Sequence, residues 1–193
     1  MFVALLDTSV LWPSLCRDFL LSLAVEGLYR LVWSDAVLDE LEYHEASKLR
    51  RAGVPADDAD RRARHLLYQM REHFADAVVT GWEPFEGTFG MPDPNDEHVV
   101  AAAVLSRAGV IVTENLKHFP PDRLPADLQV LPAAEFAHNT VAVDPALAAR
   151  AVLEISNRSG NHGPRLTPPE VLAKLEVRYG MHQATTLLRP YLH

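Results

Sequence analysis

The feature that most constrains the fold of this chain is a regular alternation of short apolar runs with longer amphipathic stretches. Runs of five to seven residues match buried β-strands in length and composition. They occupy residues 2–6, 29–34, 76–80, 109–115 and 128–132. Helical segments separate most of them, as in chains where crossovers join parallel strands. The alternation predicts an α/β fold, in which helices cover both faces of a central parallel sheet.

The segments between these runs carry helix start and stop signals. Ser14 and Ser34 are suitable N-cap residues, and Pro55 suits the first turn of a helix. A Gly/Pro-rich stretch without periodicity, residues 81–95, predicts a long loop. The predicted helices cover residues 14–27, 35–51, 55–74, 95–108 and 133–138.

The C-terminal part of the chain has no strand pattern and differs in charge. Residues 139–193 carry six basic and four acidic side chains, against 12 and 22 in residues 1–138. Helices are predicted at 144–157 and 167–179, followed by a last short helix, with a flexible joint at 157–165. Thr167 and Glu170 form a capping-box pattern at the start of the second helix. We therefore predict a domain at 1–138 and a helical C-terminal extension at 139–193.

Composition limits the class of protein. The net charge of -8 is not typical of a simple nucleic-acid clamp, although a local basic patch can still hold a phosphate backbone. The single cysteine, Cys16, excludes an intrachain disulfide and points to a reducing compartment. No apolar run reaches the roughly 18 residues of a membrane span, and residues 2–6 are too short for a signal peptide. These features predict a cytoplasmic protein that does not contact a membrane.

Acidic and amide side chains recur where the predicted strands end and the predicted helices begin. Ligands of parallel sheets bind at the carboxyl ends of the strands. Mg²⁺ and Mn²⁺ prefer oxygen ligands, usually a few carboxylates with waters and substrate phosphates. Each residue alone has another explanation, as a turn, a cap or a solvated charge. Their combined order predicts a hard-metal site, and the residues are Asp7, Glu40, Asp93, Asp96 and Asn115.

The order of these motifs resembles that of the PIN-domain ribonucleases, and in particular the VapC-type toxins of bacterial toxin–antitoxin pairs. The resemblance covers residues 1 to about 138. It rests on DTS at 7–9, VLDEL at 37–41 and DEHVVAAAVLSRAGVIVTEN at 96–115. It implies that Mg²⁺, or alternatively Mn²⁺, is held by Asp7, Glu40 and Asp96. It also implies that Asn115 completes the catalytic set, and supporting roles fall to Ser9, Asp93 and Thr113.

The resemblance further implies an endoribonuclease that hydrolyses phosphodiester bonds in structured RNA, with tRNA favoured over rRNA. A cognate antitoxin would neutralise it. Two features depart from the family pattern: Asn115 is neutral where an aspartate is common, and the tail is longer than in a minimal member. We interpret the tail as an interface with the antitoxin or with a second copy of the chain.

Two other functions remain open. The neutral Asn115 is compatible with a catalytically degenerate PIN-like module that binds RNA or protein. A phosphatase with Asp7 as covalent nucleophile is disfavoured, because Ser9 stands where a second aspartate is expected. No glycine-rich phosphate-binding motif is present, so a nucleotide cofactor is not predicted.

The remaining polar and aromatic clusters have two interpretations each. Basic residues at 47–51 and 61–65 are either a solvated helical face or a grip for RNA or antitoxin. Aromatic residues in the 81–95 loop either tuck the loop onto the core or stack on bases. His98 and His118 are interpreted as non-ligands, although both lie near the predicted site in the sequence. The basic candidates are Arg50, Arg51, Arg61 and Arg62, and the aromatic ones are Trp82, Phe85 and Phe89.

Overall fold

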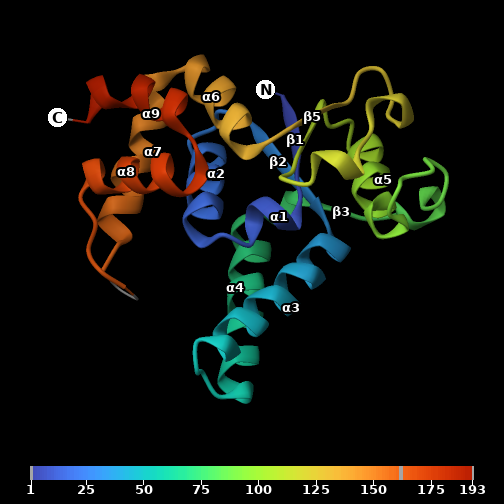
Figure 1. The fold of residues 1–193 in the computed structure, drawn as a ribbon, viewed down its shortest axis with the longest axis horizontal. Coiled ribbons are helices and arrows are strands. Elements are labelled where there is room, and N and C mark those ends of the chain that lie inside the picture. Colours follow the sequence, from blue (N-terminus) through green and yellow to red (C-terminus); the bar gives the residue numbers. More distant parts are fainter. Residues whose placement is uncertain (1, 161–162, 193) are drawn as a thin grey trace.

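Five parallel strands form the centre of the protein in the computed structural model, as Figure 1 shows. The structure describes residues 2–160 and 163–192. The strand order is β3-β2-β1-β4-β5, and each neighbouring pair is parallel. The strands are β1 (Val3–Leu6), β2 (Arg30–Ser34), β3 (Val78–Val79), β4 (Val110–Val112) and β5 (Gln129–Leu131). The predicted α/β class with a central parallel sheet is confirmed.

Helices cover both sides of this sheet. In Figure 1, α5 lies on one side of the strands, while α2 and α6 lie on the other with α7, α8 and α9 beyond them. The α3–α4 hairpin projects away from the sheet. The helices are α1 (Thr8–Leu11), α2 (Ser14–Val25), α3 (Asp35–Arg51), α4 (Ala56–His73), α5 (Glu97–Leu105), α6 (Ala133–Val143), α7 (Pro145–Arg158), α8 (Pro168–Tyr179) and α9 (His182–Leu188). None of the helices in the described parts of the chain is long and apolar enough to cross a membrane.

Strand β1 is the central strand and sets the position of the site. Leu5 pairs with Val32 of β2 on one side and with Ile111 of β4 on the other. The chain builds the sheet outward from β1 through β2 to β3, and then crosses back to add β4 and β5. The strand order therefore reverses between β1 and β4. In open parallel sheets, this is where ligands bind, beyond the carboxyl ends of the strands.

Several predicted elements have different boundaries. The expected strand at 76–80 is reduced to β3, because a 3₁₀ turn, η1 (Ala75–Ala77), precedes it. Pro13, not Ser14, occupies the N-cap position of α2. Pro55 likewise lies at an N-cap, one residue before α4 begins. The Ser34 cap is confirmed, since the Ser34 hydroxyl accepts the Val37 N–H at 3.1 Å.

The C-terminal helices pack directly against the N-terminal part. Helix α6 runs across the predicted boundary at residue 138, and α7 and α8 both contact α2. The buried faces of α7 to α9 belong to the same apolar core as the sheet. The Thr167–Glu170 capping box is confirmed. Within the predicted joint at 157–165, α7 extends to Arg158, and residues 161 and 162 lie outside the described residues.

We expect the sheet and the C-terminal helices to unfold together. Ile155 is 5% exposed in α7, so Ile155→Ala should lower the free energy of unfolding by about 2–5 kcal/mol. Glu154→Ala, next to it and exposed, should change it by less than about 0.5 kcal/mol. All three tryptophans precede residue 139, so their fluorescence in urea reports on the N-terminal part. A fluorescence transition that Ile155→Ala leaves unchanged would show two independent units.

Candidate functional site

Asp7 lies at the carboxyl end of β1 and is only 5% exposed. Its N–H donates to the Val112 carbonyl of β4 at 3.0 Å, which continues the strand pairing. Its Oδ1 accepts the Thr8 N–H at 2.8 Å. Its Oδ2 accepts the hydroxyl protons of Ser9 and Thr113, each at 2.7 Å. The buried carboxylate is therefore fixed by neutral donors from two parts of the chain.

Each of the two hydroxyl groups that hold Asp7 both donates and accepts a hydrogen bond. Because both protons point to Asp7, the oxygens are free to accept hydrogen bonds from the main chain. Ser9 Oγ accepts the Glu114 N–H, and Thr113 Oγ1 accepts the Asn115 N–H, both at 3.0 Å. These bonds connect the start of α1 to the segment that follows β4. Ser9 and Thr113 therefore position Asp7, while their roles around a metal stay a prediction.

Glu40 of α3 lies beside Asp7 through a shared neighbour, Thr8. The Thr8 hydroxyl donates to Glu40 Oε2 at 2.7 Å, while the Thr8 N–H donates to Asp7. Thr8 therefore bridges two of the predicted metal ligands. The sequence analysis did not assign it a role, although it is the middle residue of the DTS motif.

A buried histidine holds the other oxygen of Glu40. His98 Nε2 lies 3.2 Å from Glu40 Oε1, and His98 Nδ1 lies 3.1 Å from the Ser34 hydroxyl. Since the Ser34 oxygen accepts the Val37 N–H, its proton is available to His98 Nδ1. That arrangement leaves the Nε2 proton for Glu40. Burial acts to raise the pKa of Glu40, but the hydrogen bonds from His98 and Thr8, together with the electrostatic effect of His98 and His44, lower the pKa overall.

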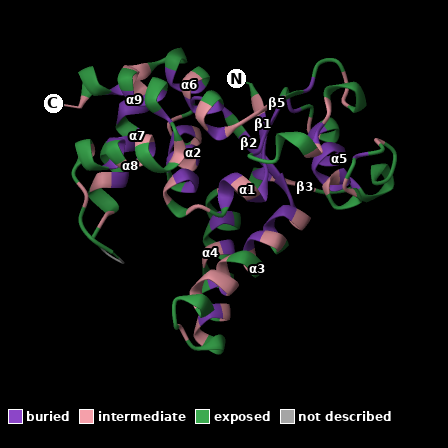
Figure 2. Cartoon of the chain, in the orientation of Figure 1, coloured by how far each residue is buried: buried purple, intermediate pink, exposed green. Residues whose placement is uncertain are grey.

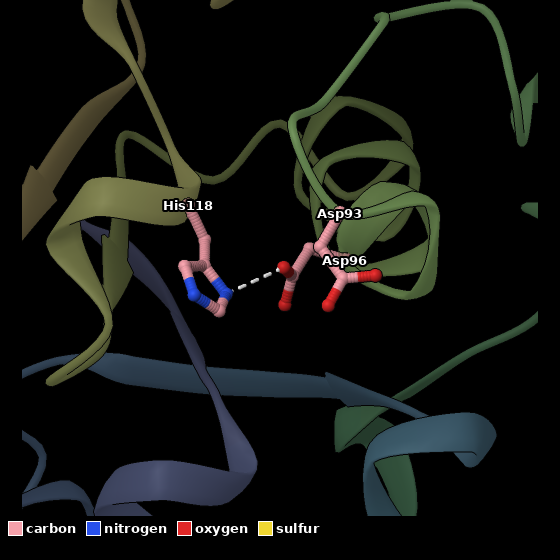
Figure 3. Close-up of side chains that lie close together, drawn as sticks. All are labelled: Asp93, Asp96 and His118. Atoms are coloured by element: carbon pink, nitrogen blue, oxygen red, sulfur yellow. Dashed lines mark hydrogen bonds and ion pairs between the residues drawn. The ribbon is translucent and has the colours of Figure 1, made fainter.

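A second group of possible ligands comes from the residues that lead into α5 and from the turn after β4. Asp93, Asp96 and His118 each offer a ligand atom, and these atoms lie within 4.8 Å of one another (Figure 3). His118 Nδ1 is 2.8 Å from Asp96 Oδ2. Burial raises the pKa of Asp96, and the nearby charges of Asp7 and Asp93 add to this, while His118 acts in the opposite direction. The contribution of Asp7 to this raised pKa indicates that Asp7 lies near enough to Asp96 for the two charges to interact.

The structure therefore brings most of the predicted site residues to one edge of the sheet. Asn115 contributes its main-chain N–H to Thr113, and its side chain is exposed. The two histidines interpreted as non-ligands both contact site carboxylates. His98 follows Asp96 by two residues and His118 follows Asn115 by three, but sequence spacing alone did not show which carboxylate each would meet.

The donor set matches the chemistry of a hard divalent cation. Asp7, Glu40 and Asp96 supply carboxylate oxygens, the ligands that Mg²⁺ and Mn²⁺ prefer. The raised pKa of Asp96 reflects burial and, in part, repulsion from Asp7 and Asp93, which a cation would relieve. The site residues thus fit the predicted ion.

Hydrogen bonds and packing hold the loop between β3 and α5 against the core. The buried Glu97 carboxylate accepts the N–H groups of Phe89 and Met91 at 3.1 and 2.7 Å. Trp82 is buried and donates its indole N–H to Asp35 at 2.9 Å. Trp82 and Phe89 therefore pack the loop onto the core, whereas Phe85 is 42% exposed.

The predicted basic cluster lies on the α3–α4 hairpin, whose end between the two helices is mostly exposed (Figure 2). Arg50 pairs with Asp60 across the hairpin, and Arg61 pairs with Asp58 at 2.9 Å. The side chains of Arg50 and Arg61 therefore form ion pairs inside the hairpin. Arg51 and Arg62 are exposed.

Comparison with known proteins agrees with this fold. The family model described as "PIN domain" matches residues 3–117, which is more than half of the chain. The chain belongs to the PIN domain family.

One curated relative is "Putative ribonuclease VapC50" of Mycobacterium tuberculosis, with 57% identity over 42 residues. This segment covers 21% of the present chain and 25% of that relative, so the chain matches about a quarter of the relative's length. No solved structure matches the chain.

Replacing Thr113 tests whether its hydroxyl group stabilises the buried Asp7 carboxylate. Thr113→Val keeps the shape of the side chain but removes the donor to Asp7 and the acceptor for Asn115 N–H. Because Thr113 is fully buried, we expect the free energy of unfolding in urea to fall by about 1–3 kcal/mol. Thr113→Ser keeps the hydroxyl and should retain most of the stability. Equal losses in the two variants would contradict this role of the hydroxyl.

Asp96 should destabilise the metal-free protein at neutral pH. Its pKa is higher in the folded protein than its ordinary value of 3.8, so ionisation disfavours the folded state. In chelator, Asp96→Asn should therefore raise Tm at pH 7. The gain should shrink as the pH falls through the raised pKa, and vanish below 3.8, where the carboxyl is protonated in both states. The exposed Asp122→Asn is the control, and a gain that does not depend on pH would contradict the argument.

Proposed function

We propose that this protein is a metal-dependent endoribonuclease and the toxin of a toxin–antitoxin pair. Membership of the PIN domain family supports a nuclease, and the similarity to a relative named as a ribonuclease supports RNA as the substrate. The observation that carries the proposal is the bridge by which Thr8 joins Asp7 and Glu40 at the carboxyl end of β1. The charge of Asp7 also acts on Asp96, which supports a place for Asp96 in the same acidic site.

In this proposal Asp7, Glu40 and Asp96 hold Mg²⁺ or Mn²⁺, with Asp93 and Asn115 beside them. An ion held by these residues would supply activation of water for attack on a phosphodiester and stabilisation of charge on the phosphoryl oxygens. The residues of the chain provide orientation. Ser9 and Thr113 fix Asp7, and Thr8 and His98 fix Glu40, so little ordering is left to occur when substrate binds.

The proposed substrate is structured RNA, with tRNA favoured over rRNA. Arg51 and Arg62 on the exposed hairpin are candidates for contact with the RNA backbone or with the antitoxin. We propose that the antitoxin blocks the site by placing a basic side chain among the carboxylates. The C-terminal helices would offer an interface for the antitoxin or a second copy, in a cytoplasmic complex.

The neutral Asn115 favours a second candidate, a PIN-like module that binds RNA or protein without cleaving it. The two functions differ in their need for a metal. Calorimetry with Mn²⁺ separates them, because a folded protein that binds no Mn²⁺ supports the binding module.

The nuclease proposal predicts metal-dependent cleavage of total tRNA or rRNA that is abolished by EDTA. Glu40→Gln removes a proposed ligand and should lower the cleavage rate by more than about 100-fold, the upper effect of an outer-shell partner. Asp39→Asn, one residue earlier on α3 with a side chain 78% exposed, should leave the rate nearly unchanged. Asp7→Ala is a second inactive variant. Full activity of Asp7→Ala would refute the assignment.

A further inference from the structure

The imidazole of His118 faces the acidic side of the site. His118 is the last residue of η4 (Leu116–His118), the 3₁₀ turn that begins after Asn115. Figure 3 shows its ring directed at Asp96, with Asp93 beside that carboxylate. The side chain of His118 is 44% exposed and that of Asp96 is 17% exposed. A ligand arriving from solvent can therefore reach both groups.

The spacing of these donor atoms suits adjacent ligands of one ion. Two donors each about 2.1 Å from an octahedral ion, at right angles, lie about 3 Å apart. His118 Nδ1 and Asp96 Oδ2 are 2.8 Å apart. Asp93 also offers an atom within 4.8 Å of the other two. Its Oδ1 accepts the Asn95 N–H at 2.9 Å, which holds the carboxylate in place.

A nitrogen ligand changes which ion the site favours. Mg²⁺ takes oxygen ligands and retains waters, whereas imidazole is a good ligand for transition metals. Carboxylates alone would serve Mg²⁺ and Mn²⁺ alike. One imidazole among them raises the affinity for Mn²⁺ without an equal gain for Mg²⁺.

We propose that His118 is a metal ligand together with Asp93 and Asp96, and that it makes the centre select Mn²⁺ over Mg²⁺. The inference rests on the metal centre of the proposed function and adds two ligands, His118 and Asp93, to Asp7, Glu40 and Asp96. The rival role for His118 is that of a hydrogen-bond partner that only orients Asp96. In that role the ring never contacts the ion, and its loss affects both ions equally.

Metal binding by the full chain, without RNA, distinguishes these roles. With Mn²⁺ as the probe, electron spin-echo spectroscopy detects a directly bound ¹⁴N nucleus. We expect a ¹⁴N signal in the unmodified protein and its loss in His118→Ala. Mn²⁺ affinity should fall by at least about 10-fold in that variant, the lower effect of an outer-shell partner, while Mg²⁺ affinity changes much less.

His118→Asp offers an oxygen in place of the nitrogen. It should abolish the ¹⁴N signal and lower the ratio of Mn²⁺ to Mg²⁺ affinity, while retaining a ligand. His73→Ala, on the exposed end of α4, is the matched control and should behave as the unmodified protein. Unchanged circular dichroism and Tm confirm that each variant is folded.

A ¹⁴N signal that is missing from the unmodified protein with Mn²⁺ bound, or that persists in His118→Ala, would overturn the inference. An equal loss of Mn²⁺ and Mg²⁺ affinity in His118→Ala would also overturn it, in favour of the orienting role. Failure of the proposed function is a separate result. RNA cleavage without the ¹⁴N signal refutes only the ligand role of His118, and the signal without RNA cleavage refutes only the nuclease.

Discussion

The buried carboxylate of Asp7 is the constraint on which the site depends. A buried charge is costly unless hydrogen bonds replace the lost water. For Asp7 the donors come from the start of α1 and from Thr113 after β4, so both segments must end beside β1. The bond from Asp7 N–H to Val112 carbonyl fixes the same register. The contacts that set the pairing of β1 with β4 therefore also set the position of the Asp7 carboxylate.

The sequence was sufficient for the sheet and for the order of the carboxylates, because both follow local patterns. Apolar runs with polar ends located the strands, and the order of Asp7, Glu40 and Asp96 along the chain indicated the site. The contacts that orient them were not predictable in this way. The hydrogen bond between Thr8 and Glu40 joins residues 32 positions apart, and the one between Ser34 and His98 joins residues 64 positions apart. These residues become neighbours only through the path of the chain between the strands. Helix α1 was missed because its four residues are too few for a periodic pattern, and the Asp7 carboxylate, accepting the Thr8 and Ser9 N–H groups, caps it.

The boundary at residue 138 shows a different limit of sequence patterns. The change in composition there is real, yet α6 continues to Val143 and packs against α9. Charge describes the solvent-facing side of a helix, whereas packing depends on its apolar side. The buried face of α7 is rich in alanine, and small side chains carry little periodic signal although they allow close helix contact.

The polarity of the partners explains why the carboxylates remain suited to a cation. Asp7 is held by hydroxyl and amide donors, and Glu40 by a hydroxyl and an imidazole. Among the described residues, every lysine or arginine ion pair involves a carboxylate outside this site. A fixed guanidinium would orient a carboxylate equally well, but it would also cancel the charge that attracts a metal ion. Neutral donors give the orientation and leave that charge in place. At Asp96, by contrast, the charges of Asp7 and Asp93 help raise the pKa, so this side of the proposed site is where a bound cation would relieve repulsion.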